Sequence, residues 1–116
     1  MYNEPTFTKI RHESISCSTA GNNTIVSAAT GKELWPVSMV LQAAEAVDVY
    51  VTCTSGSMIA SAATPLKLND TTSATAGFML PKNEFGWSRT GAGEAIVLNL
   101  STSVSVCGCI TVGESG

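Results

Sequence analysis

Charged and titratable groups are scarce in this 116-residue sequence, and their scarcity excludes several functions. Only 13% of the residues are charged, the net charge is −3, and the six Lys and Arg residues are scattered rather than clustered. A nucleic-acid-binding protein carries a basic patch, so no nucleic-acid partner is expected. The chain also has one His and two Asp, which leaves few groups to serve as acid, base or metal ligand.

Long apolar runs are missing as well. No stretch approaches the roughly 18 apolar residues that a membrane-spanning helix requires, and no apolar segment of a secretory signal follows Met1. We therefore expect a protein that is synthesised in the cytoplasm and has no membrane partner. At 12.0 kDa the chain is long enough for one domain, which would bury about 65% of its extended surface.

Hydroxyl-bearing and β-branched residues are abundant. Ser and Thr account for 28 of the 116 residues and alternate with apolar residues at the period of two that strands show. The clearest alternation is in 46–54, where Val47, Val49, Val51 and Cys53 share one face. Because no helical segment intervenes, we predict an all-β fold, an antiparallel, jelly-roll-like β-sandwich of seven or eight strands. The predicted strands cover residues 12–18, 24–28, 34–43, 46–54, 58–60, 77–80, 94–100 and 104–112, with Pro36 at an edge or a bulge.

The four cysteines, Cys17, Cys53, Cys107 and Cys109, leave three chemistries open. Free thiols buried in the core are expected in a reducing cytoplasm. The alternatives are a disulfide formed after release from the cell and a metal site, although the spacing lacks the paired C-x2–4-C of structural zinc. Cys107 and Cys109 share a face of strand 104–112, which we expect to be a layer of the core. Since the opposite face is apolar too, this strand is predicted to be central or to form a subunit contact.

No catalytic, cofactor-binding or metal-binding residues are predicted. His12 lies between charged residues and is expected at the surface or an edge, without the partner of a catalytic triad. The serines lack a G-x-S-x-G elbow, and residues 91–94 (GAGE) lack the further glycine and the helix of a phosphate-binding loop. We therefore expect that the protein is not an enzyme and needs no cofactor.

The aromatic residues Phe78, Phe85, Trp87 and Trp35 allow two interpretations. They anchor the core and a loop, or, joined by Arg89, they form a binding surface, because Trp, Tyr and Arg are enriched at interface hot spots. In the predicted loop 81–90, Phe85, Trp87 and Arg89 are therefore candidate interface or ligand-binding residues.

Several segments resemble one known family. Residues 21–28 (GNNTIVSA), 30–32 (TGK) and 40–49 (VLQAAEAVDV) are followed by 77–81 (GFMLP), 85–87 (FGW), 93–101 (GEAIVLNLS) and 104–112 (VSVCGCITV). Together they resemble small structural proteins of tailed bacteriophages, over roughly residues 12–112. The pair Cys107 and Cys109 and the dipeptide at Trp35 depart from the family pattern.

The resemblance implies a head decoration, or cement, protein on the virion surface. Its partners would be the major capsid protein and other copies of itself in a homotrimer, and it implies no catalytic residues. A sandwich domain at 12–116 would follow an N-terminal arm at 1–11, in which Tyr2, Pro5 and Phe7 stand out from a polar tract. We expect this arm to dock on the capsid or on a neighbouring subunit.

An alternative function is a tail or fibre module that binds a host receptor or a carbohydrate. In that case Trp87 would stack on a sugar ring, with Asn83, Glu84 and Arg89 supplying hydrogen bonds. A cell-envelope hydrolase would need His12 or Glu84 in a pocket, and no second catalytic group stands at a recognisable spacing.

Overall fold

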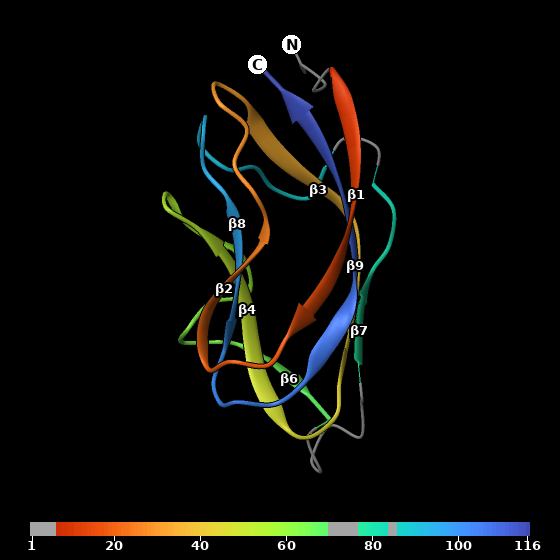
Figure 1. The fold of residues 1–116 in the computed structure, drawn as a ribbon, viewed down its shortest axis with the longest axis vertical. Coiled ribbons are helices and arrows are strands. Elements are labelled where there is room, and N and C mark those ends of the chain that lie inside the picture. Colours follow the sequence, from red (N-terminus) through yellow and green to blue (C-terminus); the bar gives the residue numbers. More distant parts are fainter. Residues whose placement is uncertain (1–6, 70–76, 84–85) are drawn as a thin grey trace.

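The chain folds into two antiparallel β-sheets packed face to face, as predicted for an all-β sandwich (Figure 1). The computed structural model describes residues 7–69, 77–83 and 86–116. These contain nine strands rather than seven or eight, because a short strand forms at Leu66–Leu68, where the sequence predicts a loop with at most brief pairing near these two leucines. The strands are β1 (Lys9–Cys17), β2 (Gly21–Val26), β3 (Glu33–Ala43), β4 (Val47–Cys53), β5 (Gly56–Ile59), β6 (Leu66–Leu68), β7 (Gly77–Leu80), β8 (Ile96–Leu100) and β9 (Val106–Ser115).

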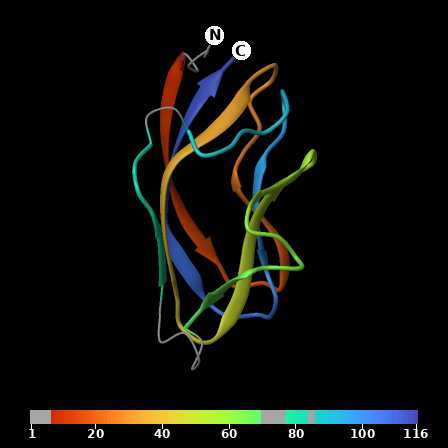
Figure 2. The same cartoon turned by 180° about the vertical axis from the view of Figure 1, so that it is seen from behind.

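Each layer is built from strands that are distant in sequence. Sheet A has the order β1-β9-β3-β7, and sheet B has the order β2-β8-β4-β5 with β6 also paired to β4. Figures 1 and 2 show the two layers from opposite sides, with the chain passing between them at both ends of the sandwich. Strand β9 therefore lies inside sheet A, in the central position that was one of the two alternatives predicted from its sequence.

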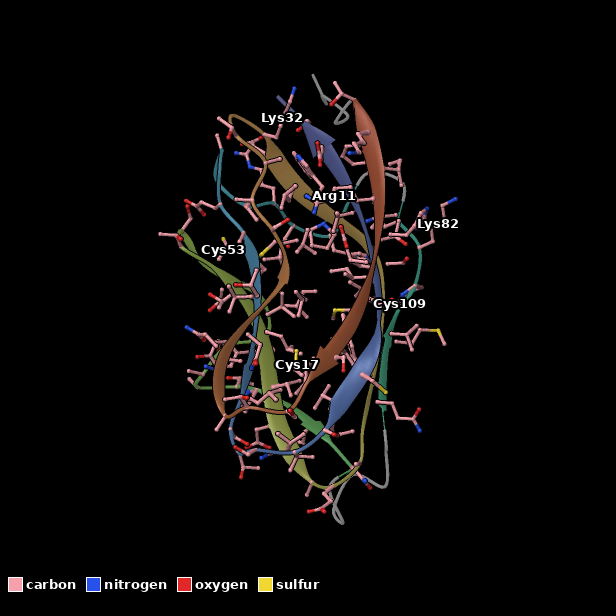
Figure 3. All side chains as sticks on the ribbon, in the orientation of Figure 1. Arg11, Cys17, Lys32, Cys53, Lys82 and Cys109 are labelled. Carbon is pink, nitrogen blue, oxygen red and sulfur yellow. The ribbon has the colours of Figure 1, made fainter. Side chains whose placement is uncertain are left out.

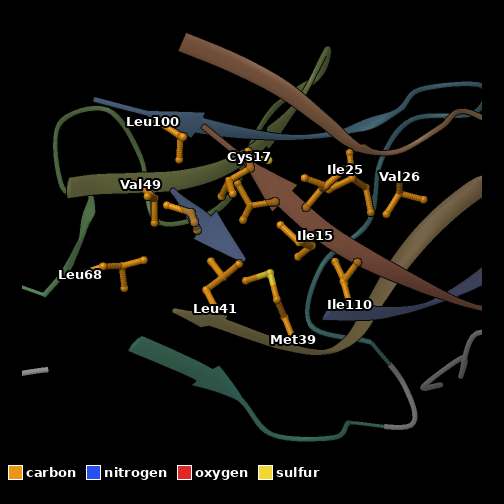
Figure 4. Packing of buried hydrophobic residues seen from close by; sticks show 14 of the residues in the cluster. Ile15, Cys17, Ile25, Val26, Met39, Leu41, Val49, Leu68, Leu100 and Ile110 are labelled. Atoms are coloured by element: carbon orange, nitrogen blue, oxygen red, sulfur yellow. The ribbon is translucent and has the colours of Figure 1, made fainter. Parts of the chain in front are cut away.

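The core lies between the sheets and consists of the inward-facing half of each alternating strand (Figure 4). In β4 the buried face is the predicted one, since Val47, Val49, Val51 and Cys53 are buried. Sheet A contributes Ile15 of β1 and other side chains that are almost wholly removed from water. These are Leu34, Met39 and Leu41 of β3, and Val106, Ile110 and Val112 of β9. Burial of such side chains contributes about 1.5–3 kcal/mol each.

Two strands of sheet A, β1 and β9, are longer than the sequence predicts. β1 begins at Lys9 rather than at residue 12, and β9 continues to Ser115 rather than ending at 112. The reason is their mutual pairing, because Lys9 lies opposite Glu114 and the register continues without interruption to Cys17 opposite Val106. A long-range ladder of this kind leaves no local signal in the sequence.

Pro36 lies at an irregularity in β3, as its missing N–H requires. The register between β3 and β9 shifts between Pro36 and Ser38, which marks a bulge. The carbonyl of Pro36 accepts a hydrogen bond from the backbone N–H of Trp87 at 2.9 Å.

A polar cluster joins the two layers near the start of β1. The Arg11 guanidinium (Figure 3) donates to Glu13 at 2.9 Å and to Glu114 at 3.3 Å, both in sheet A. It also donates to the carbonyl of Ser27, which follows β2 of sheet B, at 2.9 Å. The side chains of Arg11 and Glu114 are only 14% and 10% exposed. The ion pair is therefore largely removed from water, and Arg11 also donates hydrogen bonds to Glu13 and Ser27.

We predict that Arg11→Met destabilises the fold by about 3 kcal/mol, because it leaves Glu114 buried without its partner. The double variant Arg11→Met, Glu114→Met replaces both charges by apolar groups and is expected to recover most of that loss. Urea denaturation of the three proteins measures both effects. A double variant that is less stable than Arg11→Met would contradict this role of the pair.

A second set of polar contacts connects the β4–β5 turn to the segment before β8. One carboxylate oxygen of Glu94 accepts the Ser55 hydroxyl at 2.7 Å, and the other accepts the backbone N–H groups of Ser55 at 3.0 Å and Gly91 at 3.1 Å. The Ser55 hydroxyl above all, and then these N–H groups, hold the pKa of Glu94 below its ordinary value.

A lowered pKa in the folded state means that Glu94 stabilises the fold above the ordinary glutamate pKa of about 4.3, and that this contribution is lost as the pH falls through the lowered value. We predict that the Glu94→Gln protein loses less stability than wild type as the pH falls through this range. Melting temperatures between pH 7 and pH 3 provide the measurement. As the control, Glu45→Gln in the exposed turn after β3 should retain the wild-type profile. Identical profiles for Glu94→Gln and wild type would refute the prediction.

Candidate binding surface

The outer face of sheet A, defined as the side turned away from sheet B, carries several of the residues singled out in the sequence. Its central strand β9 presents Cys107, Cys109 and Thr111 to this side, and β3 presents Val40 and Gln42. Val40 is 42% exposed, and Met79 of the adjacent β7 is 70% exposed. An apolar strip therefore crosses the outer face from β9 to β7.

An aromatic cluster occupies one end of this face and is centred on Trp35. We define the Trp35 cluster as Phe7, Trp35 and Arg89. The ring centroids of Phe7 and Trp35 are 6.2 Å apart, with the rings tilted by 55°, and the Arg89 guanidinium carbon lies 5.7 Å from the Trp35 ring centroid. The Trp35 indole N–H donates to the Ser115 hydroxyl at 2.8 Å, which fixes the ring on the end of β9.

Phe7 reaches the cluster by crossing the end of β9. The Thr8 backbone N–H donates to the carbonyl of Glu114 at 2.7 Å, so the chain is held to the sheet directly before β1 begins. The Phe7 ring then lies over Gly113, where a Cβ atom would overlap the ring atoms. Gly113 therefore leaves the space that the Phe7 ring occupies on the outer face.

The described part of the loop 81–90 runs along the edge of β3 beyond its pairing with β7, and it places Arg89 in the cluster. The backbone N–H groups of Asn83 and Thr90 donate to the carbonyls of Val37 and Leu34 at 2.9 and 3.0 Å. Gly86 has φ of +79°, and a Cβ there would lie 3.0 Å from the Trp35 ring. The close approach of this loop to Trp35 thus depends on a glycine.

Trp87 and Arg89 are the most exposed of the described candidates in this loop. The Trp87 side chain is 46% exposed, and its indole N–H donates to the carbonyl of Pro81 at 2.8 Å, so the ring is held in place while one side meets solvent. The Arg89 side chain is 61% exposed and lies 3.5 Å from the carboxylate of Glu33. Both side chains are ordered by contacts within the chain before any partner binds.

The structure thus brings together two groups of candidates that are far apart in the sequence. Phe7, from the predicted arm, and Arg89, from the loop, both contact Trp35. Tyr2, Pro5, Phe85 and Glu84 lie outside the described residues. The sequence had assigned Trp35 only to the general aromatic group. The unusual dipeptide Trp35-Pro36 was its sole local signal, whereas the pairing with Gly113 was not apparent. Phe78, by contrast, packs against the core.

The prediction that all cysteines are core residues was wrong for two of them. Cys17 and Cys53 are buried, and burial raises the pKa of the Cys17 thiol. Cys107 and Cys109 do share one face of β9, but that face is the solvent side, because Val106 and Ile110 fill the core side. Larger branched side chains gain more from burial than thiols do, which decides the orientation of the strand. All four are free cysteines.

His12 lies at the exposed edge strand β1, as expected. Its Nδ1 is 2.9 Å from the hydroxyl of Thr111 on β9. Within the described ranges, no three His, Cys, Asp or Glu side chains gather closely enough to hold a metal ion. The notable hollow is a shallow depression of about 330 Å³ beside β7, lined mainly by Val40, Gln42, Phe78 and Met79.

Comparison of the chain with protein-family models, with curated proteins and with solved structures gives no match. In the part of the chain that the structure describes, no helix is long and apolar enough to cross a membrane.

The contact between Phe7 and Gly113 can be tested by a double-mutant cycle. We predict that Gly113→Ala destabilises the protein by about 1–3 kcal/mol, because the added methyl group displaces the Phe7 ring. In the Phe7→Ala background the same substitution should be nearly neutral, since the ring is absent. Denaturant unfolding of the four proteins measures the coupling. Equal effects in the two backgrounds would show that Phe7 does not lie on Gly113.

Proposed function

We propose that this chain is a non-enzymatic structural protein of a bacteriophage particle, a decoration protein that binds the major capsid protein and stabilises the head as a homotrimer. The observation that carries the proposal is the Trp35 cluster with the neighbouring Trp87, a preorganised aromatic and arginine surface on a rigid sandwich. The sequence resemblance to structural proteins of tailed phages supplies the identity of the partner.

The chemistry of this surface suits binding to a protein. Trp and Arg are among the side chains most enriched at interface hot spots, where truncation to Ala costs about 2 kcal/mol or more. Trp87 and Arg89 are solvent-facing and already held by Pro81 and Glu33, so little conformational entropy is lost on binding. A cement protein requires this kind of fixed contact and no turnover.

The location and partners follow from the proposal. The protein would be made in the host cytoplasm and would then reside on the capsid surface of the virion. Its net charge of −3 disfavours a nucleic-acid partner. The arm that carries Tyr2 and Pro5 would contact the capsid or the next subunit. Phe7 lies at the junction between this arm and the sandwich, because it contacts Trp35 of its own chain.

A second candidate function is a tail or fibre module that binds a carbohydrate. The 46% exposure of Trp87 favours it, since a sugar ring stacks on an open indole face. The hydrogen-bonding groups of the loop argue against it. The Trp87 N–H is already donated to Pro81, and Arg89 is engaged by Glu33 and Trp35. We therefore favour the protein partner.

The proposal predicts that Trp87→Ala weakens binding to heads at least about thirtyfold, in line with the loss of one hot-spot side chain. Deletion of residues 1–6 should weaken it as well, while leaving Phe7 and β1 in place. The measurement is co-sedimentation of the purified protein with heads that lack it, from the phage that encodes it.

The matched control is Tyr50→Ala, which removes an aromatic side chain from the outer side of sheet B and should bind as wild type does. Undiminished binding of both Trp87→Ala and the deletion variant would overturn the proposal. Glycan-array binding that is lost in Trp87→Ala would establish the carbohydrate-binding module instead.

A further inference from the structure

We infer that Cys107 and Cys109 on the outer face of sheet A form a two-coordinate site for a soft, monovalent metal ion such as Cu(I). The site goes beyond the proposed function and does not depend on a capsid partner. Both thiols are free and lie on the solvent side of β9, so an ion can reach them without unfolding of the chain. As the ion binds, each thiol gives its proton to solvent and forms one sulfur–metal bond, and the metal keeps its oxidation state.

The spacing of the two thiols is fixed by the sheet. At both cysteines β9 is paired with β1 on one side and with β3 on the other, and neither register shifts between them. At the intervening Gly108, a Cβ atom would overlap the carbonyl oxygen of Val40, so β3 lies close against the backbone here. Two Cβ atoms on the same face of such a strand are about 6.8 Å apart, which is twice the rise per residue.

This spacing suits a bridging metal ion better than a disulfide between the two cysteines. A disulfide needs Cβ atoms about 3.5–4.5 Å apart, so it would compress a strand that is hydrogen-bonded on both sides. A metal ion in line between two sulfur atoms separates them by about 4.6 Å, twice a metal–sulfur bond of about 2.3 Å. Each sulfur then needs to lie only about 1.1 Å along the strand from its own Cβ atom, which is less than the length of one covalent bond.

The surroundings of the pair determine which ion it takes. The side chains opposite the two cysteines are neutral, namely Ser14 and Ser16 on β1 and Val40 and Gln42 on β3. Within residues 7–69, 77–83 and 86–116, no third His, Cys, Asp or Glu completes a metal site. A structural Zn²⁺ site has four ligands, and Ca²⁺ and Mg²⁺ take oxygen ligands. Thiolates select Cu(I), which is stable with two sulfur ligands in line.

The inference predicts that the purified, reduced protein binds one Cu(I) ion per chain. Anaerobic competition with the coloured Cu(I) complex of bicinchoninate measures the affinity, and native mass spectrometry counts the bound ions. Cys107→Ser and Cys109→Ser should each weaken binding at least about 100-fold, because the second sulfur binds intramolecularly and its removal loses that advantage. The variant with both substitutions retains only Cys17 and Cys53, which are buried, and it should not compete for the ion.

Two matched variants keep two thiols on this face and differ in their spacing. Ser105 directly precedes β9, its side chain is exposed, and its carbonyl accepts the Ala44 N–H at 2.9 Å, so it continues the alternation of the strand. Ser105→Cys combined with Cys109→Ser retains a spacing of two residues and should restore most of the lost affinity. Ser105→Cys combined with Cys107→Ser sets the thiols four residues, about 13.6 Å, apart and should bind as weakly as a single-cysteine variant.

All of these substitutions fall on exposed side chains, so the melting temperatures should stay near that of wild type, and lost binding can be separated from unfolding. Failure of the wild type to compete for Cu(I), undiminished binding by the variant that lacks both surface thiols, equal binding by the two spacing variants, or one ion shared between two chains would each overturn the inference. Head binding is measured separately, so a failure of the proposed function is distinguishable from a failure of this site.

Discussion

The structure depends on one constraint, the position of β9 between β1 and β3. This strand is the last in the chain, and it pairs with all nine residues of β1 and with ten residues of β3. Val106, Ile110 and Val112 on its inner side form part of the core beneath sheet A. Sheet A therefore forms only when both ends of the chain and its middle have come together, which makes folding dependent on contacts of long sequence separation.

The same strand determines the two faces of the layer. Because branched aliphatic side chains occupy the inner positions of β9, the alternation of the strand directs Cys107 and Cys109 to the outside. At its end, Gly113 leaves room for Phe7, and Ser115 binds the Trp35 indole. Glu114 turns inward to Arg11, and the Arg11 contact with Ser27 ties sheet A to sheet B. The candidate binding surface is thus assembled around β9.

Local patterns in the sequence predicted most of the strands. The alternation in 46–54 identified β4 and its buried face, and the predicted strand at 77–80 coincides with β7. The sequence also offered a central position for β9 as one of two alternatives, and the structure has this one. Local patterns could not predict which strands pair. The extensions of β1 and β9 exist because these two strands pair with each other. The exposure of Cys107 and Cys109 was missed because a thiol suits either side of a sheet.

Individual residues of the candidate site were predicted from the sequence, but their convergence on one place was not. Arg89 and Phe7 were identified by residue type, since an arginine in a loop and an aromatic side chain in a polar segment both stand out. Their convergence on Trp35 depends on the path of loop 81–90 along β3 and on the crossing of β9 by Phe7. Neither path has a signature in composition or periodicity.

The central claim is that β9 lies between β1 and β3 with its branched side chains in the core and its thiols on the outer face. The most direct measurement is the rate at which a maleimide labels each cysteine of the folded protein, followed by mass spectrometry. The account predicts that Cys107 and Cys109 are labelled rapidly, whereas Cys17 and Cys53 stay protected until the protein unfolds. Protection of Cys107 and Cys109, or equal labelling of all four thiols in the folded protein, would contradict it.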